Sequence, residues 1–588
     1  MATKPDGYTD EQWALVTAAG SFFAEACPGA GKTRAIVARF IRRAREERRK
    51  GIALLSFTNV AVDEVRLRCG HEVELIAPPH FIGTFDAFIN RYLTTPLYVR
   101  TYRKAPQAYI ESWSAIPRTS VRCAKHTSNA YELDWFSFGE GGAATLEESR
   151  AGGIYKQGLL KDVATCRDDL EQRATSIYKG LVKNSGLLSS SASRWFANAQ
   201  IGNADVAVRM GTLLAHRFAE VIVDEAQDCG PEELAILDLL RHHGVNVVLI
   251  GDLDQSIYEF RRATPDKVKE FITDGPPFAL TGNFRSSRAI CRVNDSLRVG
   301  TTRDEAVGCH KDVPHPVQLI EMNDGDSVSK TLTDVVSRFG LDTNDLVVLS
   351  HRKLDASKAA GVDESDGIGN SNVAAIAMAW LAIKSEADPR ARKAAIETVE
   401  RVILKVLGLG GDDRASVSAT CDAAGVDRRW LADLALRLTL RANPHAISAG
   451  EYASKLREFL GRVKWPRSLS PGRLSDQLKA PREGQWSKLA PASSEMGLSW
   501  SSIHAAKGKE FPAVALVIPK KPVTDPDGKT ALDHWEAGTS AEVRRVLYVG
   551  ASRAEQILLL VAHANHTPRV ADLLEKAEIP FDRPTSQE

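Results

Sequence analysis

The stretch Ala26–Thr33, Ala-Cys-Pro-Gly-Ala-Gly-Lys-Thr, is a glycine-rich loop that ends in a lysine and a threonine. Backbone N–H groups of such a loop can wrap a polyphosphate, Lys32 can reach its terminal oxygens, and the threonine hydroxyl can ligate Mg²⁺. A second stretch, Val223–Asp228, follows an apolar run that is typical of a buried strand. It brings Asp224 and Glu225 to the C-terminal end of that strand, where open α/β sheets bind ligands. The two stretches predict a site that binds and hydrolyses a nucleoside triphosphate.

Size and composition limit the class of protein. A chain of 588 residues is too long for one hydrophobic core, so we expect several domains. The 76 basic and 75 acidic residues nearly cancel, so any nucleic-acid surface must be local. The N-terminus has no charged-then-apolar leader, and no apolar run approaches the roughly 18 residues of a membrane span. We therefore expect a cytoplasmic protein without a membrane partner.

The eight cysteines never form a Cys-x-x-Cys pair. This spacing argues against a zinc ribbon, an iron–sulfur cluster and a secreted disulfide scaffold. A reducing compartment, most simply a cytoplasm, is the expected environment.

Short apolar segments alternate with helical ones along two parts of the chain. In the first part, strands are predicted at 52–57, 80–85, 221–224 and 245–252, and helices at 34–50 and 231–242. A second set begins near Phe278, with strands predicted at 316–321, 345–351, 499–503, 513–519 and 557–562. This alternation predicts an α/β fold with mostly parallel sheets covered by helices.

Two stretches interrupt the alternation. The first is polar, dotted with aromatic residues and rich in serine and glycine, and the second is rich in alanine and arginine. Both are predicted to be mainly helical insertions. The expected division is 1–96 with 206–277 as the first α/β domain, 97–205 as its insertion, 278–361 with 496–570 as the second α/β domain, 362–495 as its insertion, and 571–588 as a polar tail.

Six further motifs occur in a fixed order. They are Ser56–Asn59 (SFTN), Gly83–Asp86 (GTFD), Gly251–Tyr258 (GDLDQSIY), Gly282–Ser286 (GNFRS), Ser502–Phe511 (SIHAAKGKEF) and Arg545–Ala554 (RVLYVGASRA). With the two stretches above, the set resembles superfamily 1A DNA helicases of the UvrD/Rep/PcrA type, from Gln12 to about Val561. The resemblance implies two RecA-like P-loop NTPase domains, 1A and 2A, that hold ATP between them, with the insertions as subdomains 1B and 2B. The short second insertion is atypical and leaves the choice of substrate open.

The resemblance also implies which residues bind ATP and Mg²⁺. The implied ATP-binding residues are Gln12, Ala26, Cys27, Pro28, Gly29, Ala30, Gly31, Lys32, Thr33, Arg34, Phe284 and Glu510. Thr33 and Asp224 would hold Mg²⁺, and Glu225 would orient or deprotonate the attacking water. The implied catalytic residues are Lys32, Glu225, Gln255, Arg285 and Arg553, the two arginines being donated from the opposite domain.

Contacts to the nucleoside follow from the same resemblance. The Gln12 amide offers the donor and acceptor that an adenine edge needs, although an ordinary helix-surface amide is the alternative. Arg34 and Phe284 would sandwich the base, Phe284 standing where the family usually has tyrosine. Glu510 would accept a hydrogen bond from the ribose. Lys509 stands at a position that is usually apolar, and nothing in the sequence explains that exchange.

A further set matches positions that contact DNA in the family: Phe57, Thr58, Asn59, Thr84, Phe85, Tyr258, Phe260, Arg261 and His504. Stacking of bases on aromatic rings tolerates any sequence, which suits a translocase. Phe57 and Phe85 fit a hydrophobic core equally well, and Asp86 replaces a customary histidine. The arginines at 39, 42, 43, 45, 48 and 49 most simply form a solvated helix face, with DNA contact as the alternative.

These implications favour an ATP-dependent DNA helicase that moves 3′ to 5′ on single-stranded DNA and unwinds duplex; the polarity rests on the resemblance alone. Single-stranded and tailed duplex DNA would be its substrates, and a nuclease or repair protein its partner. The alternative is a DNA-stimulated ATPase that serves as sensor or regulatory subunit of a nuclease-containing anti-phage complex, as in the Gabija system. A third interpretation is a scaffold that binds nucleotide without hydrolysing it, against which the intact catalytic set argues.

Overall fold

The computed structural model describes most of the chain. The described residues are 4–57, 59–70, 73–113, 116, 119–123, 131–148, 156–257, 265–271, 278–300, 302–324, 328–361, 371–385, 389–409, 417–466, 469–481, 486 and 498–584. They form two compact units, the first from Met1–Tyr109, Ser190–Val362 and Gly497–Glu588, the second from Ile110–Ser189 and Asp363–Met496. The domain division predicted above stays a prediction in its exact boundaries.

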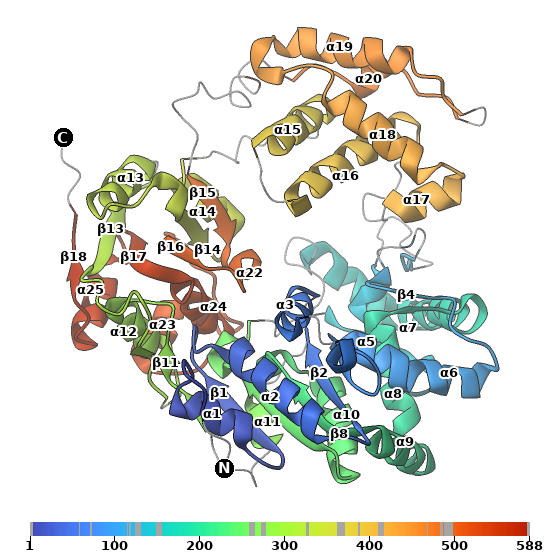
Figure 1. Cartoon of the computed structure of the whole chain (residues 1–588). Helices are drawn as coiled ribbons and strands as arrows, with labels where there is room; N and C mark the ends of the chain where they lie inside the picture. Colours follow the sequence, from blue (N-terminus) through green and yellow to red (C-terminus); the bar gives the residue numbers. More distant parts are fainter. Residues whose placement is uncertain are drawn as a thin grey trace. The chain divides into compact units, whose positions relative to one another are not determined.

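The first unit contains a six-stranded parallel sheet with the order β10-β1-β9-β8-β2-β3. Figure 1 labels its strands β1, β2 and β8. The strands of this sheet are β1 (Phe22–Ala26), β2 (Gly51–Ser56), β3 (Phe81–Thr84), β8 (Phe218–Val223), β9 (Asn246–Gly251) and β10 (Phe278–Leu280). Every residue of β2 is buried, as expected for a parallel strand covered on both faces. The helices that pack against these strands include α1 (Asp10–Thr17), α2 (Lys32–Glu46), α9 (Ala204–Arg217) and α10 (Pro231–His242). The four strands predicted in this part of the chain are confirmed.

A second six-stranded parallel sheet lies in the same unit, with the order β15-β14-β16-β17-β13-β18. Its strands are β13 (Val317–Met322), β14 (Leu346–Ser350), β15 (Ser499–Ser502), β16 (Phe511–Ile518), β17 (Ala554–His563) and β18 (Phe581–Asp582). Helices α12 (Arg288–Leu297), α22 (Ile503–Ala506), α24 (Glu542–Ala551) and α25 (Thr567–Lys576) share its hydrophobic core. Two parallel sheets with packed helices are the predicted fold, a pair of RecA-like domains.

One strand assignment from the sequence is wrong. The segment at Phe278 was predicted to begin the second α/β set, yet β10 pairs with β1 in the first sheet, Ala24 opposite Phe278. Cys27 N–H also donates to the Leu280 carbonyl at 2.9 Å. A three-residue strand carries no pattern that identifies its partner, so only the tertiary pairing could place it.

The second unit contains two hydrophobic assemblies of its own. Helices α15 (Asn372–Ser385), α16 (Pro389–Val406), α18 (Arg428–Thr439) and α19 (Ala449–Gly461) bury one core around Leu434, Tyr452 and Leu456. In the earlier stretch, α7 (Lys156–Lys179) packs beside the hairpin of β5 (Phe136–Phe138) and β6 (Ala144–Leu146), where Phe138 stacks on Tyr178 with ring centroids 3.9 Å apart.

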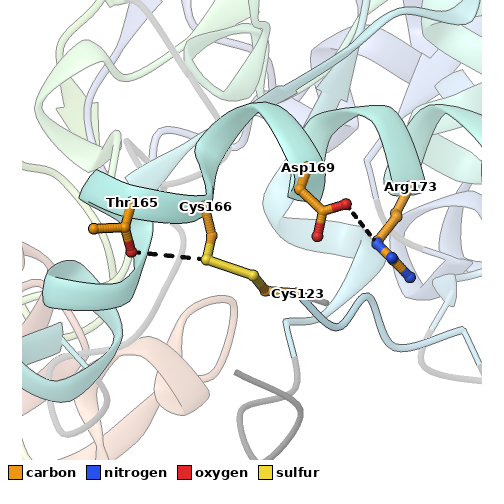
Figure 2. The surroundings of a disulfide bond; sticks show 5 residues. All are labelled: Cys123, Thr165, Cys166, Asp169 and Arg173. Carbon is orange, nitrogen blue, oxygen red and sulfur yellow. Dashed lines mark hydrogen bonds and ion pairs between the residues drawn. A yellow bond between two sulfur atoms is a disulfide. The ribbon is translucent and has the colours of Figure 1, made fainter. Parts of the chain in front are cut away.

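Cys123 and Cys166 form a disulfide in this unit, with Cα atoms 6.2 Å apart (Figure 2). Cys166 lies on α7, and the adjacent Thr165 hydroxyl approaches its sulfur at 3.7 Å. One turn further, Asp169 pairs with Arg173. The sequence did not predict this bond, because the two cysteines are 43 residues apart and belong to no spacing motif.

Among the described residues, no helix combines the length and the apolar composition needed to cross a lipid bilayer.

Arg39 on α2 does not lie on a solvated face, and the prediction is wrong for this residue. Its side chain is fully buried and forms a bidentate pair with Glu220 of β8, at 2.8 and 2.9 Å. Its remaining N–H group donates to the carbonyl oxygens of Leu15 and Ala18, both at 2.8 Å. Arg39 therefore joins α2, β8 and the end of α1, the elements that carry the phosphate loop and the Asp-Glu pair.

Replacement of Arg39 by alanine should destabilise the first sheet by up to about 3–5 kcal/mol, because the buried Glu220 would lose its bidentate partner and keep only the single contact to Arg43 at 3.3 Å. Urea-dependent hydrogen exchange of β8 measures this loss. Arg45→Ala, an exposed arginine on the same helix, is the matched control and should change stability by less than about 0.5 kcal/mol. Equal effects of the two substitutions would contradict the structural role of Arg39.

Candidate active site

The phosphate loop joins β1 to α2 and depends on two glycines. Gly29 and Gly31 both have φ of 69°, a left-handed conformation that side chains other than glycine rarely adopt. A Cβ at Gly29 would lie 2.6 Å from Asn283 Oδ1, and the Gly29 carbonyl accepts a hydrogen bond from Phe284 N–H at 2.9 Å. The segment that carries Phe284 and Arg285 therefore lies directly against the loop.

Gln12 holds the other side of the loop. Its side-chain amide donates to the Ala30 carbonyl at 2.8 Å, and its oxygen accepts from Thr9 N–H within a capping box at the start of α1. Gln12 is only 2% exposed, so the alternative of a helix-surface amide is wrong. Both ends of the amide bind the protein in this structure, and its contact to adenine stays a prediction.

Asp224 and Glu225 lie at the C-terminal end of β8, as the sequence predicts. Glu225 has φ of 54°, an uncommon backbone conformation for a residue with a side chain. Such strain costs on the order of 1–3 kcal/mol and clusters at functional sites. Its N–H donates to Asp224 Oδ1 at 2.9 Å, and Lys32 Nζ lies 3.9 Å from its Oε2. The loop lysine and the carboxylate pair thus meet at one edge of the sheet.

The surroundings of Glu225 keep it ionised. Burial alone would raise the pKa of Glu225, but the positive charge of Lys32, then Lys507, a hydrogen bond from Gln227 and the charge of Arg553 lower that pKa to about 2. Its side chain is 31% exposed, so solvent weakens these effects. A carboxylate of low pKa is suited to accepting a hydrogen bond from water and orienting it.

Arginines from the second sheet reach the same place. Arg553 is buried, donates to Gln255 Oε1 at 3.2 Å, and Gln255 in turn donates to Asp252 Oδ2 at 2.8 Å. Burial, and next the charge of Arg285, lower the pKa of Arg553 to about 10, so it remains charged at neutral pH. Gln255 is therefore a direct link between the first sheet and an arginine of the second.

Arg285 binds its neighbours through its two terminal nitrogens. It donates to the Ser552 carbonyl at 3.0 Å and pairs with Glu510, the residue predicted to bind the ribose. Its Nε is buried and has no hydrogen-bond partner within the part of the chain that the structure describes. A buried N–H without a partner costs roughly 1–3 kcal/mol. An anionic ligand beside Gly29 would remove that cost, so the residues present fit a nucleoside triphosphate.

Three further contacts join the two sheets, and sequence reasoning missed them. Lys507 Nζ lies 3.0 and 2.9 Å from the two carboxylate oxygens of Asp228. Tyr548 donates to Asp252 Oδ2 at 2.8 Å, and Arg545 donates to the Ser256 carbonyl at 2.7 Å. The sequence motifs could have indicated these contacts, because every side chain in them belongs to a motif quoted above.

A fourth feature had no sequence signal. Arg298, immediately after α12, is fully buried among four carboxylates: Glu25 at 3.3 Å, Asp252 at 3.5 Å, Asp254 at 3.3 Å and Asp304 at 2.8 Å. One arginine cannot balance these four carboxylates, of which Asp252, Asp254 and Asp304 are buried. Burial raises the pKa of Asp304 to about 7; Arg298 opposes this rise, while Asp252 and Asp295 add to it. Burial, with the charge of Asp252, likewise raises the pKa of Asp254 to about 6.

The predicted DNA contacts are only partly described. Thr58, Tyr258, Phe260 and Arg261 lie outside the described residues, as does the side chain of Asn59.

Among the others, Phe85 is buried, its ring 5.8 Å from that of Phe57, which favours the core interpretation for Phe85. The Thr84 hydroxyl accepts from Ala87 N–H and caps a short helix. Asp86, at the customary histidine position, pairs with Arg194 at 2.5 Å and is thus used within the protein.

His504 lies beside a second histidine. Its ring is 5.4 Å from that of His351, at the C-terminal end of β14. Burial lowers the pKa of both rings, that of His351 to about 4, where His504 adds to the effect. Both rings are therefore neutral near pH 7, and a contact of His504 with DNA would be a hydrogen bond rather than an ion pair.

Comparison with known proteins agrees with this geometry. Residues 8–276 match the model of the UvrD/REP helicase N-terminal domain. The N-terminal part of the chain is therefore similar to UvrD-type DNA helicases. The chain is 25% identical over 301 residues to DNA helicase II of Salmonella typhimurium and to that of Escherichia coli, a match over 50% of this chain and 40% of each relative. Over 140 residues it is 31% identical to one component of an ATP-dependent helicase/nuclease of Staphylococcus aureus, 20% of this chain and 12% of that protein. The chain thus matches less than half the length of these UvrD-type relatives.

The buried carboxylates around Arg298 predict a pH effect. Asp304 has a pKa of about 7 when folded against an ordinary 3.8, so between these pH values the folded protein binds more protons there than the unfolded chain. Its contribution to the free energy of unfolding therefore falls as the pH rises, by at most about 1.4 kcal/mol per pH unit. An asparagine at this position cannot titrate, so the stability of the wild type minus that of Asp304→Asn should decrease between about pH 5 and pH 7.

Chemical denaturation of both proteins at several pH values measures this difference, in which the ionisable groups that do not interact with Asp304 cancel. A difference that stays constant, or that grows with pH, would contradict a protonated Asp304.

Proposed function

We propose that the protein is an ATP-dependent DNA helicase that moves 3′ to 5′ on single-stranded DNA and unwinds duplex in its path. The observation that carries this proposal is the contact of Arg553, from the second sheet, with Gln255, at the edge of the first sheet that also carries the phosphate loop and Glu225. An ATPase whose catalytic arginine belongs to a second domain can convert nucleotide turnover into relative movement of the two domains.

Within the proposed site each side chain has a task. Bound ATP and Mg²⁺ would supply the phosphoanhydride bond and the charge neutralisation of phosphoryl transfer. Lys32 and the loop N–H groups bind the phosphates, Thr33 and Asp224 hold the metal, and Glu225 orients the water. The unpartnered Arg285 Nε and the guanidinium of Arg553 stabilise the charge of the transition state.

Movement requires that the contacts between the sheets differ with the nucleotide state. A ligand shifts a conformational equilibrium only through differential contacts with the two states. Gln255 offers such a difference, since a phosphate oxygen can replace Asp252 as the acceptor from Gln255, or replace Gln255 as the acceptor from Arg553. Lys507 pairs with Asp228 of the first sheet and lies three residues after His504 in the same motif. A change in the Lys507–Asp228 pair on nucleotide binding would therefore shift the backbone that carries His504, a predicted DNA contact.

Single-stranded and tailed duplex DNA are the proposed substrates, with a nuclease or repair protein as partner in the cytoplasm. The alternative function, a DNA-stimulated ATPase that regulates a nuclease in anti-phage defence, draws support from the relative that is named a helicase/nuclease. The two proposals differ in whether ATP turnover separates strands.

Strand separation on fluorescent duplexes with a 3′ or a 5′ single-stranded tail tests the function. We expect ATP-dependent release from the 3′-tailed duplex only. Glu225→Gln should reduce DNA-stimulated ATP turnover by about 10²–10⁴, because the water loses its oriented acceptor, and should abolish release while ATP binding persists. Asp205→Asn, an exposed carboxylate on α9, is the matched control and should behave as wild type.

Three outcomes would count against the proposal. Turnover without release from either duplex favours the regulatory ATPase, and release from the 5′-tailed duplex alone reverses the polarity. ATP binding without turnover in the wild type favours the scaffold.

A further inference from the structure

Arg34, predicted to stack on the nucleobase, is itself stacked on Tyr8, four residues before Gln12. It is the third residue of α2 and is exposed, and its guanidinium carbon lies 4.4 Å from the centre of the Tyr8 ring. This separation is well within the roughly 6 Å of a cation–π contact. An exposed arginine samples many rotamers, and an aromatic platform restricts that freedom.

The backbone before Tyr8 leaves room for this stack. Gly7 has φ of 85°, and a Cβ at this position would lie 2.8 Å from Arg34 Nη2. Any other residue would be strained in this conformation and would press on the guanidinium. Gly7 and Tyr8 together therefore form a seat for the arginine side chain.

The seat is fixed relative to the rest of the proposed nucleotide site. Thr9, next to Tyr8, caps α1, and Gln12 ties that helix to the Ala30 carbonyl of the phosphate loop. Glu11 accepts hydrogen bonds from the N–H and hydroxyl of Thr281 at 2.8 and 2.7 Å. Three residues further, Phe284 N–H donates to the Gly29 carbonyl, and the residue is 37% exposed. These contacts fix the positions of Tyr8, Arg34 and Phe284 relative to the phosphate loop.

We propose that Tyr8 is a positioning residue for the nucleobase. It holds the Arg34 guanidinium flat, so that a purine enters between Arg34 and the ring of the exposed Phe284 at a smaller entropic cost. The proposal rests on the ATP site proposed above and extends it to the choice of base. A purine overlaps the guanidinium over two fused rings and a pyrimidine over one, so Tyr8 favours purine nucleotides.

The experiment compares Tyr8→Ala, Tyr8→Phe and the control Tyr109→Ala, an exposed tyrosine outside the site. Tyr8→Ala should raise the KM for ATP about two- to five-fold, the equivalent of an exposed cation–π contact of about 0.5–1 kcal/mol, without changing kcat. The KM for a pyrimidine triphosphate should change less. Tyr8→Phe and Tyr109→Ala should match the wild type.

Two further measurements separate positioning from damage to the loop. Inorganic tripolyphosphate has no base, so its inhibition constant should be the same for wild type and Tyr8→Ala. In an Arg34→Ala background, Tyr8→Ala should have no additional effect, because the two residues act as one unit.

An unchanged KM in Tyr8→Ala, a parallel loss of tripolyphosphate binding, or failure of Tyr8→Phe to retain wild-type KM would overturn the inference. If the wild type does not hydrolyse ATP, the proposed function fails first. Turnover by the wild type with no shift in Tyr8→Ala overturns the role of Tyr8 alone.

Discussion

The amide of Gln255 is the contact on which the rest of the proposed mechanism depends. It donates to Asp252 and accepts from Arg553. One side chain therefore joins the loop after β9 to the short connection between α24 and β17. An amide suits this position because it is donor and acceptor at once and carries no charge. Gln255 therefore holds Arg553 near the proposed phosphate site through a hydrogen bond, which a phosphate can replace more easily than an ion pair. That arrangement lets a nucleotide compete for the arginine.

Buried charge around this contact keeps the two sheets together in the first unit. Asp252 also accepts from Tyr548 and faces Arg298, which gathers carboxylates from β1, from the loop after β9 and from the segment before β12 (Glu305–Ala306). Each of these groups is costly to bury alone and acceptable only in the presence of the others. We therefore expect the buried charges around Arg298 to stay in place. The contacts expected to change are those that a nucleotide can replace, such as the hydrogen bond between Gln255 and Arg553.

Local patterns predicted most of the fold and the outline of the site. Continuous apolar runs located the long parallel strands, and fixed spacing located Lys32, Asp224 and Glu225 on one edge of a sheet. Four features could not be predicted because they depend on tertiary pairing. The strand at Phe278 joins the first sheet, Arg39 turns inward to meet Glu220 nearly two hundred residues later, and Cys123 pairs with Cys166. Arg298 is the clearest case, since a lone arginine after a helix is ordinarily a surface residue and only the folded chain surrounds it with carboxylates.

The central claim is that Arg553, carried by the second sheet, stabilises the transition state of hydrolysis at the first. Arg553→Lys keeps the positive charge but removes the planar fork of donors that contacts Gln255. Its ATP dissociation constant and its single-turnover hydrolysis rate, measured together, test the claim most directly. We expect binding within about three-fold of wild type and a rate lower by about 10³ or more. An unchanged rate would show that the catalytic arginine lies elsewhere, and would contradict the account.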